Sequence, residues 1–287
     1  MRTLKYVRLI SCAALLLAGG ACRAADVPRW ETLPDALPLP QLATQGHVDH
    51  LGASIWYGTV GDGQPVILLH GGLESSQDWG NQVSALVDNH YQVIMMDTRG
   101  HGRSTLGPYP LSYELMQSDV IAVMDVLHLQ KAKFVGWSDG AIMSLITAIK
   151  NPERVVAVFA FGANMNTQGV NPNANSSPIL AQVAPRLAAE YESISPTPNG
   201  FGTLAQDLNT LQAVAPDYTT VQLQEIQVRH IAIVDGDHDE FILPDHERYL
   251  AGTIPGAKLI FLPSVSHFAP WQDPDTFNRT MLKFLAS

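Results

Sequence analysis

Gly136-Trp137-Ser138-Asp139-Gly140 is the stretch that decides the fold of this chain. The apolar segment Lys133 to Val135 leads into it, and the helix-like run Ala141 to Lys150 follows. A Gly-x-Ser-x-Gly pentapeptide in this setting predicts a strand, a sharp turn and a helix, with the serine at the apex of the turn. Glycine suits both flanks, because side chains there would collide with the neighbouring strand and helix. Ser138 is therefore a candidate nucleophile, and a buried structural serine is the alternative.

The strands and helices expected on either side of this turn alternate along the chain. Such alternation is typical of a mostly parallel sheet in a three-layer α/β domain. The expected strands are His47–Tyr57, Pro65–Leu69, Gln92–Met96, Lys133–Val135, Val155–Phe161, Arg229–Val234 and Lys258–Leu262. The expected helices are Val83–Asn89, Ser112–Leu127, Ala141–Lys150 and Asp275–Ala286.

One interval, Met165 to Gln227, breaks this alternation. Roughly 60 residues without secondary structure would be unusual inside a compact domain, so we predict a small helical cap inserted over the sheet. The chain then divides into a first part of the core at residues 25–164, the cap at 165–228 and a second part of the core at 229–287. Five apolar cap residues either wall a substrate pocket or pack the cap onto the core: Phe201, Leu204, Leu208, Leu211 and Tyr218.

The first 24 residues match a secretory signal peptide, with a basic start, the apolar run Leu9 to Leu17 and then small residues. The apolar run is too short for a membrane span, which needs about 20 residues. Cleavage is expected after one of three alanines, Ala21, Ala24 or Ala25. We therefore expect a secreted or periplasmic protein whose mature form has no membrane span.

Both cysteines lie in or beside this signal, at Cys12 and Cys22. A mature chain that begins after Ala24 would contain no cysteine, so its stability must come from the core and not from disulfides. Cys22 also permits a second interpretation, a lipid-anchored bacterial lipoprotein. Gly19 argues against the anchor, because it occupies the position where a lipid-attachment signal prefers an aliphatic residue.

The charge of the chain limits its partners. The net charge is −10, and it becomes −14 without residues 1–24, which hold four basic residues and no acidic one. An acidic protein with few lysines has no electrostatic footprint for nucleic acid or for an anionic membrane surface. We expect a small neutral or cationic molecule as the partner, and the oligomeric state stays open.

Nucleophilic serine chemistry needs a base within hydrogen-bond reach and an acid that orients the base. After this type of turn the order along the chain is Ser, acid, His. The apolar segment Ile231 to Val234 leads into a loop in which Asp239 is the preferred acid, because it lies beyond Gly236. Asp235 and Asp237 compete with it, and their other role would be turn formation or helix capping.

The base is expected in the loop after the next strand. His267 lies there, after Lys258–Leu262 and ahead of the closing helix. None of the other nine histidines has this order, loop context and distance from the C-terminus. We therefore predict His267 as the base.

Acyl transfer also needs N–H donors for the tetrahedral oxyanion, one from the residue after the nucleophile and one from the loop after an earlier strand. The backbone N–H of Asp139 is the first candidate. Gly72 is the second, because His70-Gly71-Gly72-Leu73 follows the strand Pro65–Leu69, and the amide of Leu73 is the alternative. We also predict that Leu73 and Trp137 contact the substrate.

Five ordered motifs resemble the α/β-hydrolase superfamily, from about His47 onward. They are His70-Gly71-Gly72, Asp97 to Ser104, Gly136 to Gly140, Gly236 to Asp239 and Ser266-His267. The resemblance implies an α/β fold with an eight-stranded mostly parallel sheet, a Ser138-Asp239-His267 triad and no cofactor or metal. Gly136 to Gly140, together with Phe161 to Asn164, is similar to the valacyclovir hydrolase branch, which cleaves α-amino acid esters.

The side chain of Asp139 carries its own hypothesis. A carboxylate directly after the nucleophile could pair with a substrate ammonium and so favour amino esters. The alternative is that Asp139 caps the following helix, where its charge suits the positive helix end.

Together these observations predict a secreted serine hydrolase that cleaves a small ester, thioester, lactone or activated amide, most simply a carboxylic ester. Perhydrolysis or carbon–carbon bond hydrolysis on the same scaffold are alternatives, as is a non-catalytic ligand-binding protein. A dehalogenase or epoxide hydrolase is disfavoured, because those enzymes need a carboxylate where Ser138 stands.

Overall fold

The computed structural model describes residues 27–287. The predicted signal peptide at residues 1–24, its cleavage sites and the lipid-anchor alternative at Cys22 lie outside the described residues. Within residues 27–287, no helix is both long enough and apolar enough to cross a bilayer.

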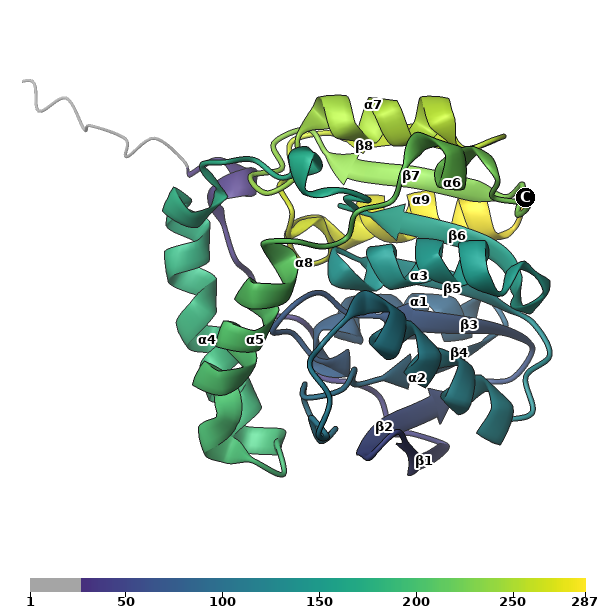
Figure 1. The fold of residues 1–287 in the computed structure, drawn as a ribbon, viewed down its shortest axis with the longest axis vertical. Helices are drawn as coiled ribbons and strands as arrows, with labels where there is room; N and C mark the ends of the chain where they lie inside the picture. The colour runs from purple at the N-terminus through teal and green to yellow at the C-terminus, as the bar shows by residue number, and fades with distance from the viewer. Residues whose placement is uncertain (1–26) are drawn as a thin grey trace, which may run out of the picture.

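The centre of the molecule is an eight-stranded sheet in the order β1-β2-β4-β3-β5-β6-β7-β8 (Figure 1). Its strands are β1 Thr44–His50, β2 Ala53–Val60, β3 Gln64–Leu69, β4 Tyr91–Met96, β5 Ala132–Trp137, β6 Val155–Phe161, β7 Ile231–Gly236 and β8 Lys258–Leu262. Only β2 pairs antiparallel with its neighbours, β1 and β4, and every other pairing is parallel. The predicted fold class, an eight-stranded mostly parallel sheet flanked by helices, is confirmed.

One expected strand is wrong. The segment His47–Tyr57 does not form a single strand, because the chain reverses at Leu51 and Gly52 and continues as β2. Both turn residues have a positive φ, 45° at Leu51 and 75° at Gly52. A single glycine between two stretches of alternating apolar and polar residues is only a weak sequence indication of a chain reversal.

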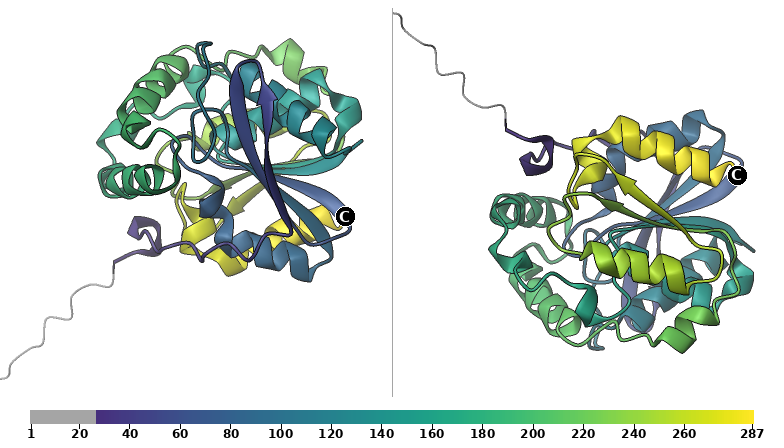
Figure 2. Two further views of the ribbon diagram at one scale, coloured as in Figure 1. Left: turned by 90° about the horizontal axis from the view of Figure 1, so that it is seen from below. Right: turned by 90° about the horizontal axis from the view of Figure 1, so that it is seen from above.

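Helices cover both faces of the sheet (Figure 2). Successive side chains of a strand point to opposite faces, so Ile67 and Leu69 of β3 pack with one group of helices and Val66 and Leu68 with the other. The first group is α2 Tyr113–Val126, α3 Asp139–Lys150 and α7 Pro244–Thr253. The second group is α1 Gly80–Asp88, α8 Ala269–Gln272 and α9 Pro274–Leu285.

The chain between β6 and β7 forms three further helices, α4 Pro178–Ile194, α5 Phe201–Gln212 and α6 Thr220–Gln224. α4 and α5 lie across the end of the sheet to which the parallel strands point (Figure 1). The carboxyl ends of parallel strands are where α/β proteins bind ligands. The two helices therefore cover the carboxyl edge of the sheet, where a ligand would bind.

The turn at Ser138 depends on close backbone approach. Ser138 has φ 54° and ψ −119°, an unfavourable conformation for a residue with a side chain. A Cβ atom on Gly136 would lie 2.3 Å from the carbonyl oxygen of Gly140, and one on Gly140 would lie 2.0 Å from that of Leu69. The glycines thus let β5, α3 and β3 meet around the serine.

We predict that Gly136→Ala lowers the free energy of unfolding by about 1–3 kcal/mol or more, because the atoms it would contact belong to the backbone and cannot turn away. The measurement is a urea unfolding midpoint. Gly202→Ala is the matched control, since a Cβ atom there meets nothing within 4 Å and lies in α5. It should raise the free energy of unfolding by roughly 0.4–1 kcal/mol. Equal midpoints for Gly136→Ala and the wild type would contradict this account of the turn.

Candidate active site

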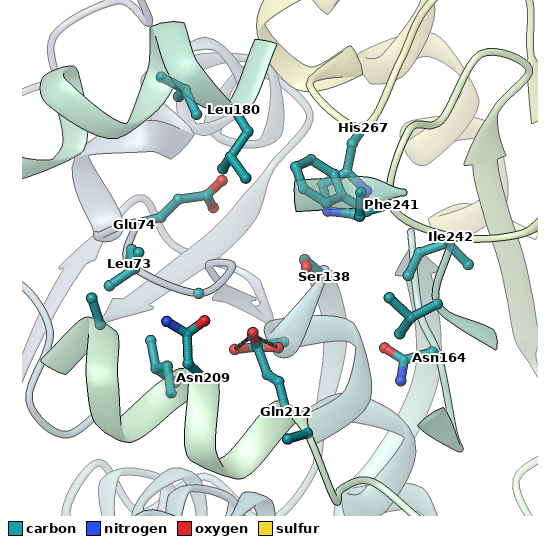
Figure 3. A pocket seen from close by; sticks show the side chains of 18 of the residues that line it. Leu73, Glu74, Ser138, Asn164, Leu180, Asn209, Gln212, Phe241, Ile242 and His267 are labelled. Atoms are coloured by element: carbon teal, nitrogen blue, oxygen red, sulfur yellow. Dashed lines mark hydrogen bonds between the residues drawn. The ribbon is translucent and has the colours of Figure 1, made fainter. Parts of the chain in front are cut away.

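A cavity of about 480 Å³ lies between the carboxyl edge of the sheet and helices α4 and α5. Ser138 and His267 both face into it (Figure 3). Ser138 reaches it from the apex of the β5–α3 turn, where its backbone N–H donates to the carbonyl oxygen of Phe161 at 2.8 Å. His267 reaches it from the loop between β8 and α8.

Asp239 and His267 form a buried hydrogen-bonded pair. Nδ1 of His267 lies 2.5 Å from Oδ2 of Asp239, and the two side chains are 6% and 0% exposed. Oδ1 of Asp239 accepts the backbone N–H groups of Phe241 at 2.7 Å and Ile242 at 2.8 Å. Asp239 is therefore fixed by three donors, and the imidazole is oriented with its other nitrogen, Nε2, available.

The charges of this pair support each other. Burial raises the pKa of Asp239, but His267 and the hydrogen bonds to the carboxylate outweigh burial, so the pKa lies below its ordinary value. Burial lowers the pKa of His267, but the Asp239 carboxylate outweighs burial and leaves the pKa above its ordinary value. The carboxylate thus favours the imidazolium that would form when His267 accepts a proton.

Neither of the two competing acids hydrogen-bonds the imidazole of His267. Asp237 accepts the backbone N–H of Ser264 and pairs with His238, away from the imidazole. Asp235 is fully buried and lies close behind Asp239, with its Oδ1 accepting the backbone N–H of Gly236. Of the three aspartates, only Asp239 hydrogen-bonds His267. The three side chains bring possible metal-ligand atoms within 4.8 Å of one another, and Asp239 and His267 are hydrogen-bonded to each other within this cluster.

Within residues 27–287, no hydrogen bond joins the Ser138 hydroxyl to the His267 imidazole. The two side chains nevertheless share the cavity wall. The imidazole is held from behind by Gly162, where a Cβ atom would lie 2.7 Å from Cε1 of His267 and where φ is +64°. In a structure without substrate such catalytic contacts are often long, and they tighten in the complex.

Three residues that line the cavity with Ser138, namely Gly72, Leu73 and Asp139, have backbone N–H groups without a hydrogen-bond partner among residues 27–287. Asp139 is the first residue of α3, so its N–H has no partner inside the helix. Neither Gly72 nor Leu73 donates a backbone hydrogen bond to any described residue. Gly71, in contrast, donates its N–H to Oε2 of Glu74 at 2.7 Å. The geometry keeps both Gly72 and Leu73 available as the second donor.

Of Leu73 and Trp137, the two residues predicted to contact the substrate, the structure places one in the cavity wall and the other in the core. Leu73 lines the cavity, but Trp137 does not. Trp137 is fully buried and packs edge-on against Trp271, with ring centroids 5.0 Å apart. As the last strand residue before Ser138, it points into the core layer that contains α8 and α9. Of the five apolar cap residues, Leu208 lines the cavity, and the other four do not.

The carboxylate of Asp139 also lines the cavity, and it does not cap α3. Its Oδ1 accepts the Tyr113 hydroxyl at 2.7 Å, and Nε2 of Gln212 lies 3.2 Å from Oδ1 and 3.1 Å from Oδ2. Burial raises the pKa of Asp139, while these hydrogen bonds oppose the shift. Tyr113 belongs to α2 and Gln212 to α5, so the Asp139 carboxylate is hydrogen-bonded both by a helix that packs on the sheet and by a helix between β6 and β7.

Several polar residues of the cavity were missed by the sequence analysis, namely Glu74, Tyr113, Asn164, Asn209 and Gln212. Glu74 directly follows the His70–Leu73 segment, and Asn164 is the last residue of the Phe161–Asn164 motif, so their positions just after β3 and β6 could have identified them as cavity residues. Tyr113, Asn209 and Gln212 lie on helices α2 and α5, and no local sequence signal indicates that they line the cavity. Burial, with Asp78 nearby, raises the pKa of Glu74 well above its ordinary value.

The cavity lining carries acids but no lysine or arginine in the described part of the chain. Its ionisable side chains are Glu74, Tyr113, Asp139 and His267. Much of the remaining wall is apolar, including Leu73, Leu180, Val183, Leu187, Phe241 and Ile242. Such a lining suits a small, largely apolar molecule that is neutral or cationic.

Comparison with known proteins agrees with this geometry. A family model described as the alpha/beta hydrolase fold matches residues 64–187. The putative carbamate hydrolase RutD of Caulobacter segnis is 29% identical over 271 residues, which cover 84% of this chain and 98% of that protein. The 2-hydroxy-6-oxo-6-phenylhexa-2,4-dienoate hydrolase of Comamonas testosteroni is 26% identical over 261 residues, covering 80% of this chain and 91% of that protein.

Among solved structures, Est816, described as an N-acyl homoserine lactone degrading enzyme, is similar to this chain. Its TM-score is 0.69 at 27% identity, and the match covers 83% of this chain and 99% of Est816. The family match, these similarities and the eight-stranded sheet together show that the chain has the α/β-hydrolase fold.

Proposed function

We propose that this chain is a serine hydrolase that cleaves a small ester, or a related thioester, lactone or activated amide, through an acyl-enzyme on Ser138. The observation that carries the proposal is the buried 2.5 Å hydrogen bond between Asp239 and His267, in the same cavity as Ser138 at its strained turn. Nucleophile, base and orienting acid then occupy the order that this fold uses.

In the proposed reaction, Nε2 of His267 accepts the Ser138 proton as Oγ attacks the substrate carbonyl carbon. The N–H groups of Asp139 and of Gly72 or Leu73 stabilise the oxyanion, and loss of one such donor typically costs about 3 kcal/mol. The imidazolium gives its proton to the leaving group, which departs and leaves an acyl-enzyme. Water, deprotonated by His267, then releases the acid and restores the serine.

The lining of the cavity narrows the substrate class. The relative from Comamonas testosteroni is named for a dienoate, which carries a carboxylate. A cavity with Glu74 and Asp139 and no lysine or arginine provides no counter-charge for such an anion. We therefore favour neutral or cationic esters over carbon–carbon bond hydrolysis of an anionic substrate.

An α-amino ester is the preferred candidate, as in the valacyclovir hydrolase branch that the nucleophile motif resembles. Asp139 follows the nucleophile directly, and its carboxylate keeps acceptor capacity beyond the bonds from Tyr113 and Gln212. A Cβ atom on Gly72 would lie 2.8 Å from Oδ2 of Asp139, so the carboxylate is beside the proposed oxyanion site. In an α-amino ester the ammonium is on the carbon atom next to the scissile carbonyl, so an ammonium bound at Asp139 would place that carbonyl near the oxyanion donors.

We further propose that the protein acts outside the cytoplasm, on the basis of the signal-like first 24 residues. The division into a core at 25–164 and 229–287 and a cap at 165–228 is proposed as the functional division as well, with α4 and α5 selecting the substrate.

The first prediction concerns the nucleophile. A fluorophosphonate probe should label the wild-type protein and abolish its hydrolysis of p-nitrophenyl acetate, whereas Ser138→Ala should not be labelled and should lose roughly 10³-fold or more in kcat. Ser144→Ala is the control, because this serine is buried on α3, lies outside the cavity lining and donates its hydroxyl to the carbonyl oxygen of Gly140. An unlabelled wild type without esterase activity would support a ligand-binding protein instead.

The second prediction concerns pH. His267 acts as a base only when neutral, so activity should rise as pH increases through its pKa. Because Asp239 holds that pKa above its ordinary value, the acidic limb of kcat/KM for an uncharged ester should lie above about pH 6.5. Asp239→Asn removes this charge and should move the limb to lower pH while reducing kcat. A wild-type limb below that of free imidazole would contradict the assignment.

The third prediction concerns the substrate ammonium. The wild type should favour an aminoacyl ester over its des-amino analogue by about tenfold or more in kcat/KM, since a hydrogen-bonded charge contributes about 1.5–3 kcal/mol. Asp139→Asn should lose most of this preference. Glu74→Gln is the matched variant of the other cavity acid and should retain it. Equal preference in the wild type and Asp139→Asn would exclude this role for Asp139.

A further inference from the structure

A second aspartate lies directly behind the Asp239–His267 pair. Asp235 is the penultimate residue of β7, and its side chain is fully buried. Oδ1 accepts the backbone N–H of Gly236 at 2.8 Å. Oδ2 is buried and has no hydrogen-bond partner among the described residues. The proposed mechanism does not use this carboxyl group.

The neighbour of Asp235 is another acid. One side-chain atom from each of Asp235, Asp239 and His267 lies within 4.8 Å of the other two. Glu247 of α7 is a further buried acid on the same side. No lysine or arginine in residues 27–287 hydrogen-bonds Asp235 or Asp239. Charges on two neighbouring buried carboxylates repel each other, so a proton on one of the two aspartates is favoured.

The hydrogen bonds decide which aspartate holds it. Asp239 accepts from two backbone N–H groups and from the imidazole, all of which stabilise its charged form. Asp235 accepts from one N–H group only, and its second oxygen lacks a donor. A proton on Oδ2 of Asp235 would remove this unsatisfied position by donating to Asp239. Burial, followed by the charge of Asp239, raises the pKa of Asp235 well above its ordinary value.

We propose that Asp235 is a positioning residue that stays protonated at neutral pH and donates a hydrogen bond to Asp239, which limits the basicity of His267. The inference rests on the proposed function for its catalytic meaning. The donated bond stabilises the negative charge on Asp239, so the carboxylate stabilises the imidazolium of His267 less strongly. His267 is then a weaker base than it would be without the bond from Asp235. The reacting groups themselves stay Ser138, His267 and Asp239.

The test is a titration of the His267 Cε1–H signal by NMR in the mature protein, with the signal assigned by its loss in His267→Gln. The acidic groups that face His267 are Asp239 and Glu240 from the loop after β7 and Asp139 from α3. Glu247 faces the aspartates from α7. Asp235→Asn keeps a neutral N–H donor for Asp239 and an oxygen acceptor for the N–H of Gly236. Asp235→Leu keeps the approximate size of the side chain but has neither the donor nor the acceptor. Asp237→Asn is the control, because this neighbouring acid faces Ser264 and His238.

The proposal predicts a different pKa of His267 for Asp235→Leu than for the other two variants. Asp235→Asn and Asp237→Asn should leave the pKa of His267 unchanged, and Asp235→Leu should raise it by about one unit, because Asp239 loses a donor. A downward shift in Asp235→Asn would overturn the proposal, since it would mean that the wild-type group is an anion. An unchanged pKa in a folded Asp235→Leu would overturn it as well.

A second measurement decides the matter even where Asp235→Leu does not fold. The infrared difference spectrum between the wild type and Asp235→Asn at neutral pH should contain the carbonyl stretch of a protonated carboxylic acid, and absence of that band would overturn the proposal. Neither the titration nor the spectrum uses catalysis. If the wild type hydrolyses no ester while the band and the shifts appear as expected, the proposed function fails and the assignment of the proton stands.

Discussion

The close approach of β5, α3 and β3 around Ser138 is the constraint on which the rest of the site depends. Gly136 and Gly140 leave no room for side chains, since Cβ atoms there would lie 2.3 Å and 2.0 Å from carbonyl oxygens. This contact lets α3 begin one residue after the serine, so the free N–H of Asp139 and the hydroxyl of Ser138 face the same cavity. The strain at Ser138 is tolerated because strands buried on both faces hold the turn.

Around this turn the structure places several acids and few cations. Asp239 is stabilised as an anion by three donors, whereas Asp235, Glu74 and Glu247 are buried with raised pKa values. All four groups are buried, so the difference comes from the charge of His267 and from the hydrogen bonds that Asp239 accepts. Of these four acids, Asp239 favours its ionised form, and Asp235, Glu74 and Glu247 favour their protonated forms.

Much of this arrangement follows from local sequence. The Gly-x-Ser-x-Gly turn and the position of Asp239 and His267 after successive strands were sufficient to predict which side chains share one sheet edge. The strand over His47–Tyr57 failed because a reversal at Leu51 and Gly52 has little local signature. The direction of Trp137 and the contacts of Tyr113 and Gln212 with Asp139 depend on packing between distant segments, which no short pattern encodes.

The bond from Gln212 to Asp139 has a consequence for how such an enzyme changes during evolution. The amide belongs to α5 and the carboxylate to the first turn of α3, so the pocket floor and its roof share one polar contact. A substitution that reshapes the roof to admit a bulkier molecule would also alter the solvation of the acid below it. A substitution in α5 that changes which substrate sizes fit the pocket is therefore expected to change which substrate charges it accepts as well.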